Sequence, residues 1–122
     1  MILSATFLAG CSTGSWTEAK RERVVNAGPA SHYLTDGVYG AHRQDGFFIV
    51  RQGSRLFALS SICTHRKCKL TAEADRTYYC PCHGSTFDAT GRVTEGPARR
   101  DLPVLPSRID AGGDFLVTIN EP

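Results

Sequence analysis

The chain has 122 residues, of which 41% are hydrophobic and 21% are charged, and its formal net charge is +2. This length fits a single domain, and the composition is that of a folded globular protein rather than a disordered or membrane-embedded one. A nucleic-acid-binding protein would need a denser basic stripe, so no nucleic-acid partner is expected. Five cysteines are many for this length, and an odd number cannot all pair within the chain.

The N-terminal residues are expected to be a signal segment and a tether. Residues 1–10 carry no charge and are too few to cross a bilayer as a helix, which needs about 20 apolar residues. Leu8-Ala9-Gly10-Cys11 resembles a bacterial lipobox, in which the cysteine is lipidated; a chance run of small residues is the alternative. We therefore predict a lipid anchor at Cys11, a signal and tether over 1–31, and a location on the periplasmic side of the cytoplasmic membrane.

From residue 32 onward the sequence favours short β-strands. Residues 47–51 and 55–60 are apolar or alternating runs, and Gln52-Gly53-Ser54 between them is typical of a hairpin. The charged segment 18–25 fits either a short helical turn or part of the tether. Further strands are expected at 77–80, 86–88, 92–94, 107–110 and 115–120. Many short strands at even spacing predict an all-β domain over 32–122, a small antiparallel sandwich or barrel.

Four cysteines and two histidines lie close together between residues 63 and 83. They are Cys63, His65, Cys68, Cys80, Cys82 and His83. Two disulfides would leave both histidines unexplained. A zinc site would use two cysteines and two histidines, but zinc ligands are typically spaced as like pairs, C-x(2–4)-C and H-x(3–5)-H. Here each pair is mixed, Cys-x-His and Cys-x-x-His. This pattern matches a [2Fe–2S] cluster with two thiolates on one iron and two imidazoles on the other.

On these motifs, the segment 56–105 resembles a Rieske iron–sulfur domain of the disulfide-containing subtype. The resemblance implies that Cys63 and Cys80 bind one iron and that His65 and His83 bind the other. It also implies one Rieske-type cluster and a small antiparallel β-sandwich with a cluster-binding subdomain of two loops, 63–68 and 80–87. The remaining pair, Cys68 and Cys82, falls where this subtype has a disulfide between the two loops.

The resemblance assigns further residues around the cluster. Ser85 stands where high-potential family members donate a hydrogen bond to a bridging sulfide, and Phe87 stands where those members often have a tyrosine. An intermediate potential for the family is therefore expected. Gly96-Pro97-Ala98 resembles the proline loop that covers the cluster, with an ordinary turn as the alternative.

The first loop differs from that of quinol-oxidising relatives, which read Cys-Thr-His-Leu-Gly-Cys. Arg66 and Lys67 replace the Leu-Gly pair, and Lys69 follows. A charged rim suits an acidic protein partner better than an apolar quinol head, although a solvated loop face is the alternative. His32 and His42 lie outside the motif and are expected at the surface or at strand ends.

The function expected from the resemblance is one-electron transfer by a membrane-tethered carrier or redox subunit. Its partner would be another redox protein, such as a cytochrome or a membrane oxidoreductase, and no separate catalytic site is visible in the sequence. One alternative is the small subunit of a larger oxidoreductase, like a quinol or arsenite oxidase. Another is a soluble ferredoxin of a ring-hydroxylating dioxygenase, which lacks the disulfide. A structural zinc-binding module is the alternative of a different class.

Overall fold

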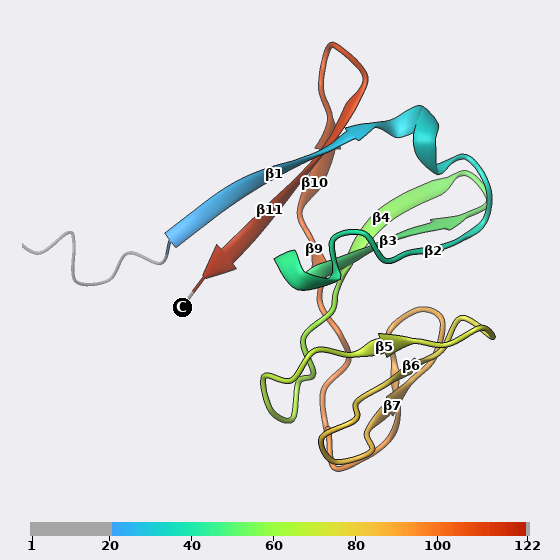
Figure 1. Cartoon of the computed structure of the whole chain (residues 1–122), viewed down its shortest axis with the longest axis vertical. Coiled ribbons are helices and arrows are strands. Elements are labelled where there is room, and N and C mark those ends of the chain that lie inside the picture. The colour runs from blue at the N-terminus through green and yellow to red at the C-terminus, as the bar shows by residue number, and fades with distance from the viewer. Residues whose placement is uncertain (1–20, 122) are drawn as a thin grey trace, which may run out of the picture.

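The computed structural model of the chain describes residues 21–121, which form short strands and two 3-10 turns (Figure 1). The strands are β1 (Arg21–Pro29), β2 (Gly37–Tyr39), β3 (Phe47–Gln52), β4 (Arg55–Ser60), β5 (Thr71–Ala72), β6 (Tyr78–Tyr79), β7 (Thr86–Phe87), β8 (Val93–Glu95), β9 (Val104–Leu105), β10 (Ser107–Ile109) and β11 (Asp114–Glu121). The 3-10 turns are η2 (Ala30–Tyr33) and η3 (Arg43–Asp45).

Three antiparallel sheets make up the described part of the chain. One joins β1, β11 and β10, a second joins β2, β3, β4 and β9, and a third joins β5, β6, β7 and β8. Figure 1 shows the sheet of very short strands at one end of the molecule and the β1–β11–β10 sheet at the other. The expected all-β fold is confirmed, and the short-stranded sheet is the expected subdomain that carries two loops.

The β3–β4 hairpin lies at the centre of the fold and is buried on both faces. Successive side chains of a strand point to opposite faces of its sheet. Phe47 and Ile49 pack into a core shared with β11, whereas Phe48 and Val50 pack into a second core shared with β6 and β7. Burial of each such side chain contributes about 1.5–3 kcal/mol. The uninterrupted apolar run of β3 is explained by these two cores, and the predicted hairpin turn lies between Gln52 and Arg55.

Strand β1 differs from the sequence-based expectation. The segment 18–25 was predicted as a helical turn or tether, but from Arg21 onward it pairs with β11, beginning with Arg21 opposite Glu121. β1 is at the edge of its sheet, and Ala27 is its one buried side chain. Because such a strand is held mainly by backbone hydrogen bonds, its side chains can be charged and give no strand signal. The folded domain therefore begins before the boundary expected at residue 32.

The predicted lipidation residue, Cys11, and the predicted signal lie outside the described residues. Within residues 21–121, no helix has the length and apolar character needed to cross a bilayer.

Gly91 allows close contact between the turn after β7 and strand β4. Its φ is 90°, and a methyl group on its Cα would lie 2.9 Å from the Cδ1 atom of Leu59. We expect Gly91→Ala to lower the free energy of unfolding by about 2 kcal/mol, because both the backbone and the packing must shift. Gly113 has a similar φ of 93° but no neighbour within 4 Å, so Gly113→Ala should cost less. Denaturant unfolding of both variants checks this; equal losses would show that the contact with Leu59 is unimportant.

Candidate metal centre

Two loops of the short-stranded subdomain present the six predicted cysteine and histidine residues. The loop between β4 and β5 carries Cys63, His65 and Cys68, and the loop between β6 and β7 carries Cys80, Cys82 and His83. A backbone hydrogen bond closes each loop: Cys63 N–H donates to the carbonyl of Cys68 at 2.8 Å, and Cys80 N–H donates to the carbonyl of Ser85 at 2.9 Å. Each loop thus returns on itself within a few residues and holds its cysteines and histidine at one end of the subdomain.

A disulfide joins the two loops. The sulfurs of Cys68 and Cys82 are 1.97 Å apart, and their Cα atoms are 6.5 Å apart. This confirms the pairing that the family resemblance implied. Cys63 and Cys80 are free thiols with exposures of only 3% and 1%. One cysteine pair is therefore oxidised and structural, whereas the other is available as thiolate ligands.

The two histidines of the loops lie next to each other. The ring centroids of His65 and His83 are 5.0 Å apart and the rings are nearly perpendicular, at 84°. The Nδ1 atom of His65 is buried and has no hydrogen-bond partner among the described residues. Burial, His83 and Arg66 lower the pKa of His65, which favours the neutral imidazole that binds metals. A buried nitrogen without a partner is costly, and a metal ion would satisfy it.

The thiols of Cys63 and Cys80 interact directly and differ in acidity. Burial by itself raises the pKa of Cys63, but hydrogen bonds from the backbone N–H groups of His65 and Arg66, from the Cys80 thiol and from Ser85 outweigh it, and the pKa is lowered. The pKa of Cys80 is raised, chiefly by burial. A network that already stabilises a thiolate at Cys63 favours the binding of a cation at this position.

The arrangement fits a two-iron cluster better than a single metal ion. Tetrahedral zinc, with bonds of about 2.0–2.3 Å, brings its ligand atoms within roughly 3.3–3.8 Å of one another. Among residues 21–121, the atoms that converge within 4.8 Å are the sulfurs of Cys68, Cys80 and Cys82. Two of these sulfurs are bonded to each other and cannot be ligands. The set Cys63, His65, Cys80 and His83 does not converge on one point, as a site with thiolates on one iron and imidazoles on another requires.

Ser85 connects the second loop to the predicted proline loop. Its side chain is fully buried, and its hydroxyl oxygen accepts a hydrogen bond from the backbone N–H of Ala98 at 2.9 Å. The same hydroxyl hydrogen-bonds the thiol of Cys63. This bond lowers the pKa of the Cys63 thiol, as expected where the hydroxyl donates its proton to the sulfur. The proline loop, whose Gly96–Pro97 peptide is cis, is thus tied to the ligand region through a single side chain.

Thr64 and Arg100 form a second connection, which the sequence analysis missed. The Thr64 hydroxyl donates to the carbonyl of Arg100 at 2.7 Å, and the Arg100 guanidinium donates to the carbonyl of Thr64 at 3.3 Å. These bonds join the first loop to the segment that follows the proline loop. Thr64 lies inside the Cys-x-His motif, but nothing in the sequence marks Arg100 as its partner.

Tyr78 is a further residue of the centre that the sequence analysis did not single out. It is fully buried in the core that contains Cys63 and Cys80, and its ring lies 5.2 Å from that of Phe48. Its hydroxyl has no hydrogen-bond partner among the described residues, and burial raises its pKa to about 12. The phenol is therefore neutral and fills the core beneath the two loops.

Phe87 is the position where the side chain should most directly change the potential of a bound cluster. It is fully buried in the same core as Cys63 and Cys80 and offers no hydrogen-bond donor there. We expect Phe87→Tyr to raise the reduction potential by roughly 40 mV, because a hydroxyl that donates to sulfur stabilises the reduced state by about 1 kcal/mol. Protein-film voltammetry measures the shift. A potential that stays constant or falls would contradict the role of Phe87; Tyr79→Phe, on an exposed side chain, is the control.

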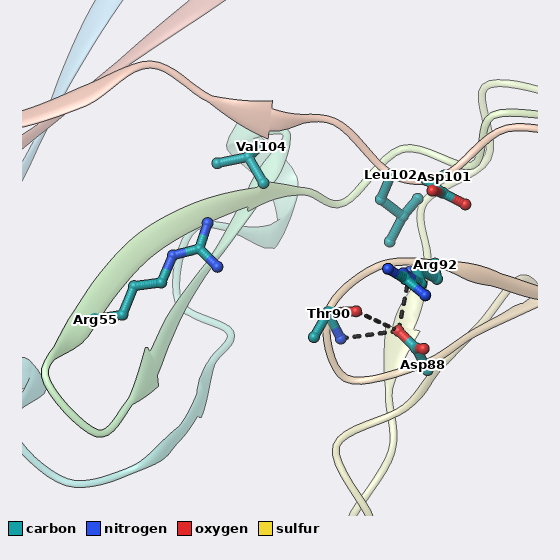
Figure 2. A pocket seen from close by; sticks show the side chains of 7 residues that line it. All are labelled: Arg55, Asp88, Thr90, Arg92, Asp101, Leu102 and Val104. Carbon is teal, nitrogen blue, oxygen red and sulfur yellow. Dashed lines mark hydrogen bonds between the residues drawn. The ribbon is translucent and has the colours of Figure 1, made fainter.

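A hollow of about 530 Å³ lies away from the predicted ligands, between β4 and the turn after β7 (Figure 2). The Asp88 carboxylate at its edge accepts hydrogen bonds from the N–H and hydroxyl of Thr90, at 2.9 and 2.8 Å, and from the N–H of Arg92 at 3.0 Å. This carboxylate is therefore occupied in holding the turn. The remaining lining residues are Arg55, Asp101, Leu102 and Val104, so the hollow includes none of the cysteines or histidines.

Comparison with known proteins agrees with this arrangement. The family model described as Rieske [2Fe-2S] domain matches residues 16–106. The chain is 34% identical over 99 residues to the chloroplastic cytochrome b6-f complex iron-sulfur subunit of Arabidopsis thaliana, covering 78% of this chain and 42% of that protein. It is 36% identical over 75 residues to the cytochrome b6-f complex iron-sulfur subunit of Chlorobaculum thiosulfatiphilum, covering 61% and 40%. The chain thus spans about two fifths of the length of these relatives.

Among solved structures, the chain resembles the cyanobacterial plasma membrane Rieske protein PetC3 from Synechocystis PCC 6803. The TM-score is 0.56 at 30% identity, over 76% of this chain and 97% of that one. A chain of a hyperthermophilic respiratory Complex III gives a TM-score of 0.57 at 25% identity, over 74% of this chain and 71% of that one. The family match over most of the sequence, the loop disulfide and the mixed cysteine–histidine pairs agree: the chain belongs to the Rieske [2Fe–2S] family and takes one Rieske-type cluster.

Proposed function

We propose that this protein transfers single electrons through a cluster held by Cys63 and Cys80 on one iron and by His65 and His83 on the other. The observation that carries this proposal is the buried, unpartnered Nδ1 atom of His65 beside the ring of His83, on loops that also hold two buried free thiols. When bound, such a cluster supplies a one-electron couple at roughly −150 to +300 mV.

The protein residues control access to this centre. Phe87, Leu70 and Tyr78 are fully buried around the two thiols and exclude water from the sulfur side. His83, in contrast, is exposed to solvent, and His65 is half-buried. The imidazole side is therefore the one that an electron-transfer partner could approach once a cluster is bound.

The location and partners of the protein are also part of the proposal. A lipid anchor at Cys11 would hold the domain at the outer face of the cytoplasmic membrane, on the periplasmic side. The disulfide supports such an oxidising compartment, because disulfides persist there and are rare in the cytosol. The partner would be a cytochrome or a membrane oxidoreductase. The protein would reach it either as a tethered carrier or as a subunit of the same complex. The similarity to iron-sulfur subunits of cytochrome b6-f complexes favours the second arrangement.

Electron paramagnetic resonance of the dithionite-reduced protein tests the proposed function. A Rieske centre gives a rhombic signal whose average g lies below the free-electron value, and metal analysis should find two iron and two sulfide per chain. Stoichiometric zinc without this signal would instead identify a structural zinc module and overturn the proposal. To test the anchor, Cys11→Ser should release the protein from membranes without changing the spectrum.

A further inference from the structure

The basic residues of this chain are concentrated around the predicted metal centre. We define the cluster tip as residues 63–70, 80–87 and 96–100. The tip contains no acidic residue and five basic ones: Arg66, Lys67, Lys69, Arg99 and Arg100. The whole chain has 14 basic and 12 acidic residues. The residues outside the tip are therefore nine basic and 12 acidic, which gives them a net charge of −3, whereas the tip has +5. The small overall charge of +2 therefore hides an uneven distribution of charge along the sequence.

The charges of the tip are free to act on a partner. Arg66, Lys67 and Arg99 are exposed, and none of the three has a side-chain hydrogen bond or ion pair within residues 21–121. Arg100 is also exposed, although its guanidinium donates to Thr64. Three acidic residues directly adjoin the segments of the tip: Asp88, Glu95 and Asp101. The Asp88 carboxylate accepts bonds that hold its own turn, and Asp101 accepts the backbone N–H of Val93. None of these carboxylates forms a salt bridge with a tip cation in the described structure.

A hollow in the tip lies directly beside a predicted ligand. It measures about 380 Å³ and is lined by Thr64, His65, Pro97, Arg99 and Arg100. Two arginines and a histidine thus line an open space large enough for a side chain of a partner protein. A carboxylate is the side-chain group that arginine recognises best, because it accepts two parallel N–H bonds.

We infer that the cluster tip is a docking face for a redox protein whose own surface around its redox centre is rich in carboxylates. This inference rests on the proposed function: electrons must cross where the imidazole rings meet solvent, so the partner has to contact this face. Complementary charge then raises the association rate, by 10- to 1000-fold in typical steered pairs, and fixes the orientation of the pair. One partner carboxylate would enter the hollow between Arg99 and Arg100.

The sign of the electrostatic potential around the cluster is tested by comparing the rates at which an anionic and a cationic small oxidant react with the reduced protein. The reduced protein is mixed by stopped flow with anionic hexacyanoferrate(III) or with cationic tris(phenanthroline)cobalt(III). With wild type, the hexacyanoferrate rate should fall by about tenfold as ionic strength rises from about 10 to about 500 mM, and the cobalt rate should rise. A hexacyanoferrate rate that is independent of salt would overturn the inference.

Two double variants with the same change in net charge show whether the charges of the cluster tip cause the fast reaction with hexacyanoferrate. Lys67→Glu with Arg99→Glu reverses charges at the tip, and Arg21→Glu with Arg108→Glu does so on exposed residues of the β1–β11–β10 sheet, at the far end in Figure 1. At low salt the tip variant should lose about tenfold in the hexacyanoferrate rate, whereas the control should stay within about twofold. Equal losses in both variants would mean that the rate depends on the net charge of the protein and not on the position of the charges, and would overturn the inference.

Polyglutamate and lipid vesicles distinguish an acidic protein from an anionic membrane as the occupant. Polyglutamate should slow the hexacyanoferrate reaction of wild type and leave the tip variant unaffected. Inhibition by phosphatidylglycerol-containing vesicles but not by polyglutamate would overturn the inference in favour of a lipid surface. The spectrum and potential of each variant are measured first. An absent Rieske signal then counts against the proposed function. A normal signal with a hexacyanoferrate rate that does not fall with salt counts against the docking face alone.

Discussion

Alanine in place of either His65 or His83 should abolish the Rieske spectrum of the reduced protein and lower the bound iron by at least about tenfold. Changes to groups that only support a ligand already cost about 10–100-fold in metal affinity, so removal of the ligand itself should cost no less. Without the ring, a bound cluster would lack one of its proposed ligands, and water or a competing thiol could take its place. The effect should be the same at both residues, because each ring would fill one of the two imidazole positions on the same iron.

The other two histidines are matched controls for this experiment. The His42 Nδ1 atom lies 2.8 Å from the Asp45 carboxylate, and its ring stacks on Phe47, so the side chain is fully engaged away from the loops. His32 is exposed beside Tyr33. Alanine at His32 or His42 should leave iron content and spectrum unchanged. Far-ultraviolet circular dichroism checks that each variant is folded. Retention of the spectrum after loss of His65 or His83 would contradict the ligand assignment.

The features that could be predicted from the sequence are those fixed by local pattern. The β3–β4 hairpin was predicted because a buried apolar run, a glycine turn and a second run are contiguous in the chain. The Cys68–Cys82 disulfide was implied by the family resemblance, which itself rests on two motifs of fixed spacing, and the structure confirms it. In each case, the information lies within a short stretch of sequence or in two motifs of fixed spacing.

The features that were missed depend on which segments meet in three dimensions. Strand β1 has a charged sequence, and its strand conformation follows from pairing with β11, almost the length of the chain away. The bonds between Thr64 and Arg100 link residues 36 positions apart, and no local pattern identifies this pair. The buried hydroxyl of Tyr78 is recognised only once the packing of β6 under the loops is known. Edge strands and loop-to-loop bonds therefore need the tertiary structure.

Opening the disulfide should shorten the lifetime of the bound cluster by about 10- to 100-fold. The bridge closes a loop with a sequence separation of 14, and a bridge across about 15 residues stabilises a folded chain by about 3 kcal/mol. Each 1.4 kcal/mol lost from a barrier is about a factor of ten in rate. Without the bridge, the two loops are held together by weaker contacts, such as the hydrogen bond between the Ser85 hydroxyl and the Cys63 thiol. The half-life is measured from the visible absorbance of the protein at fixed temperature.

Comparison of single and double variants separates the mechanical role of the bridge from the chemistry of a released thiol. In Cys68→Ser or Cys82→Ser, one free sulfur stays close to a predicted ligand, because the sulfurs of Cys68, Cys80 and Cys82 lie within 4.8 Å of one another. This thiolate can replace a ligand, so each single variant should show an altered spectrum as well as a shorter half-life. The double variant, with both serines, contains no competing thiol. It should keep the wild-type spectrum and lose only lifetime, whereas a half-life equal to that of wild type would show that the bridge does not hold the loops around the cluster.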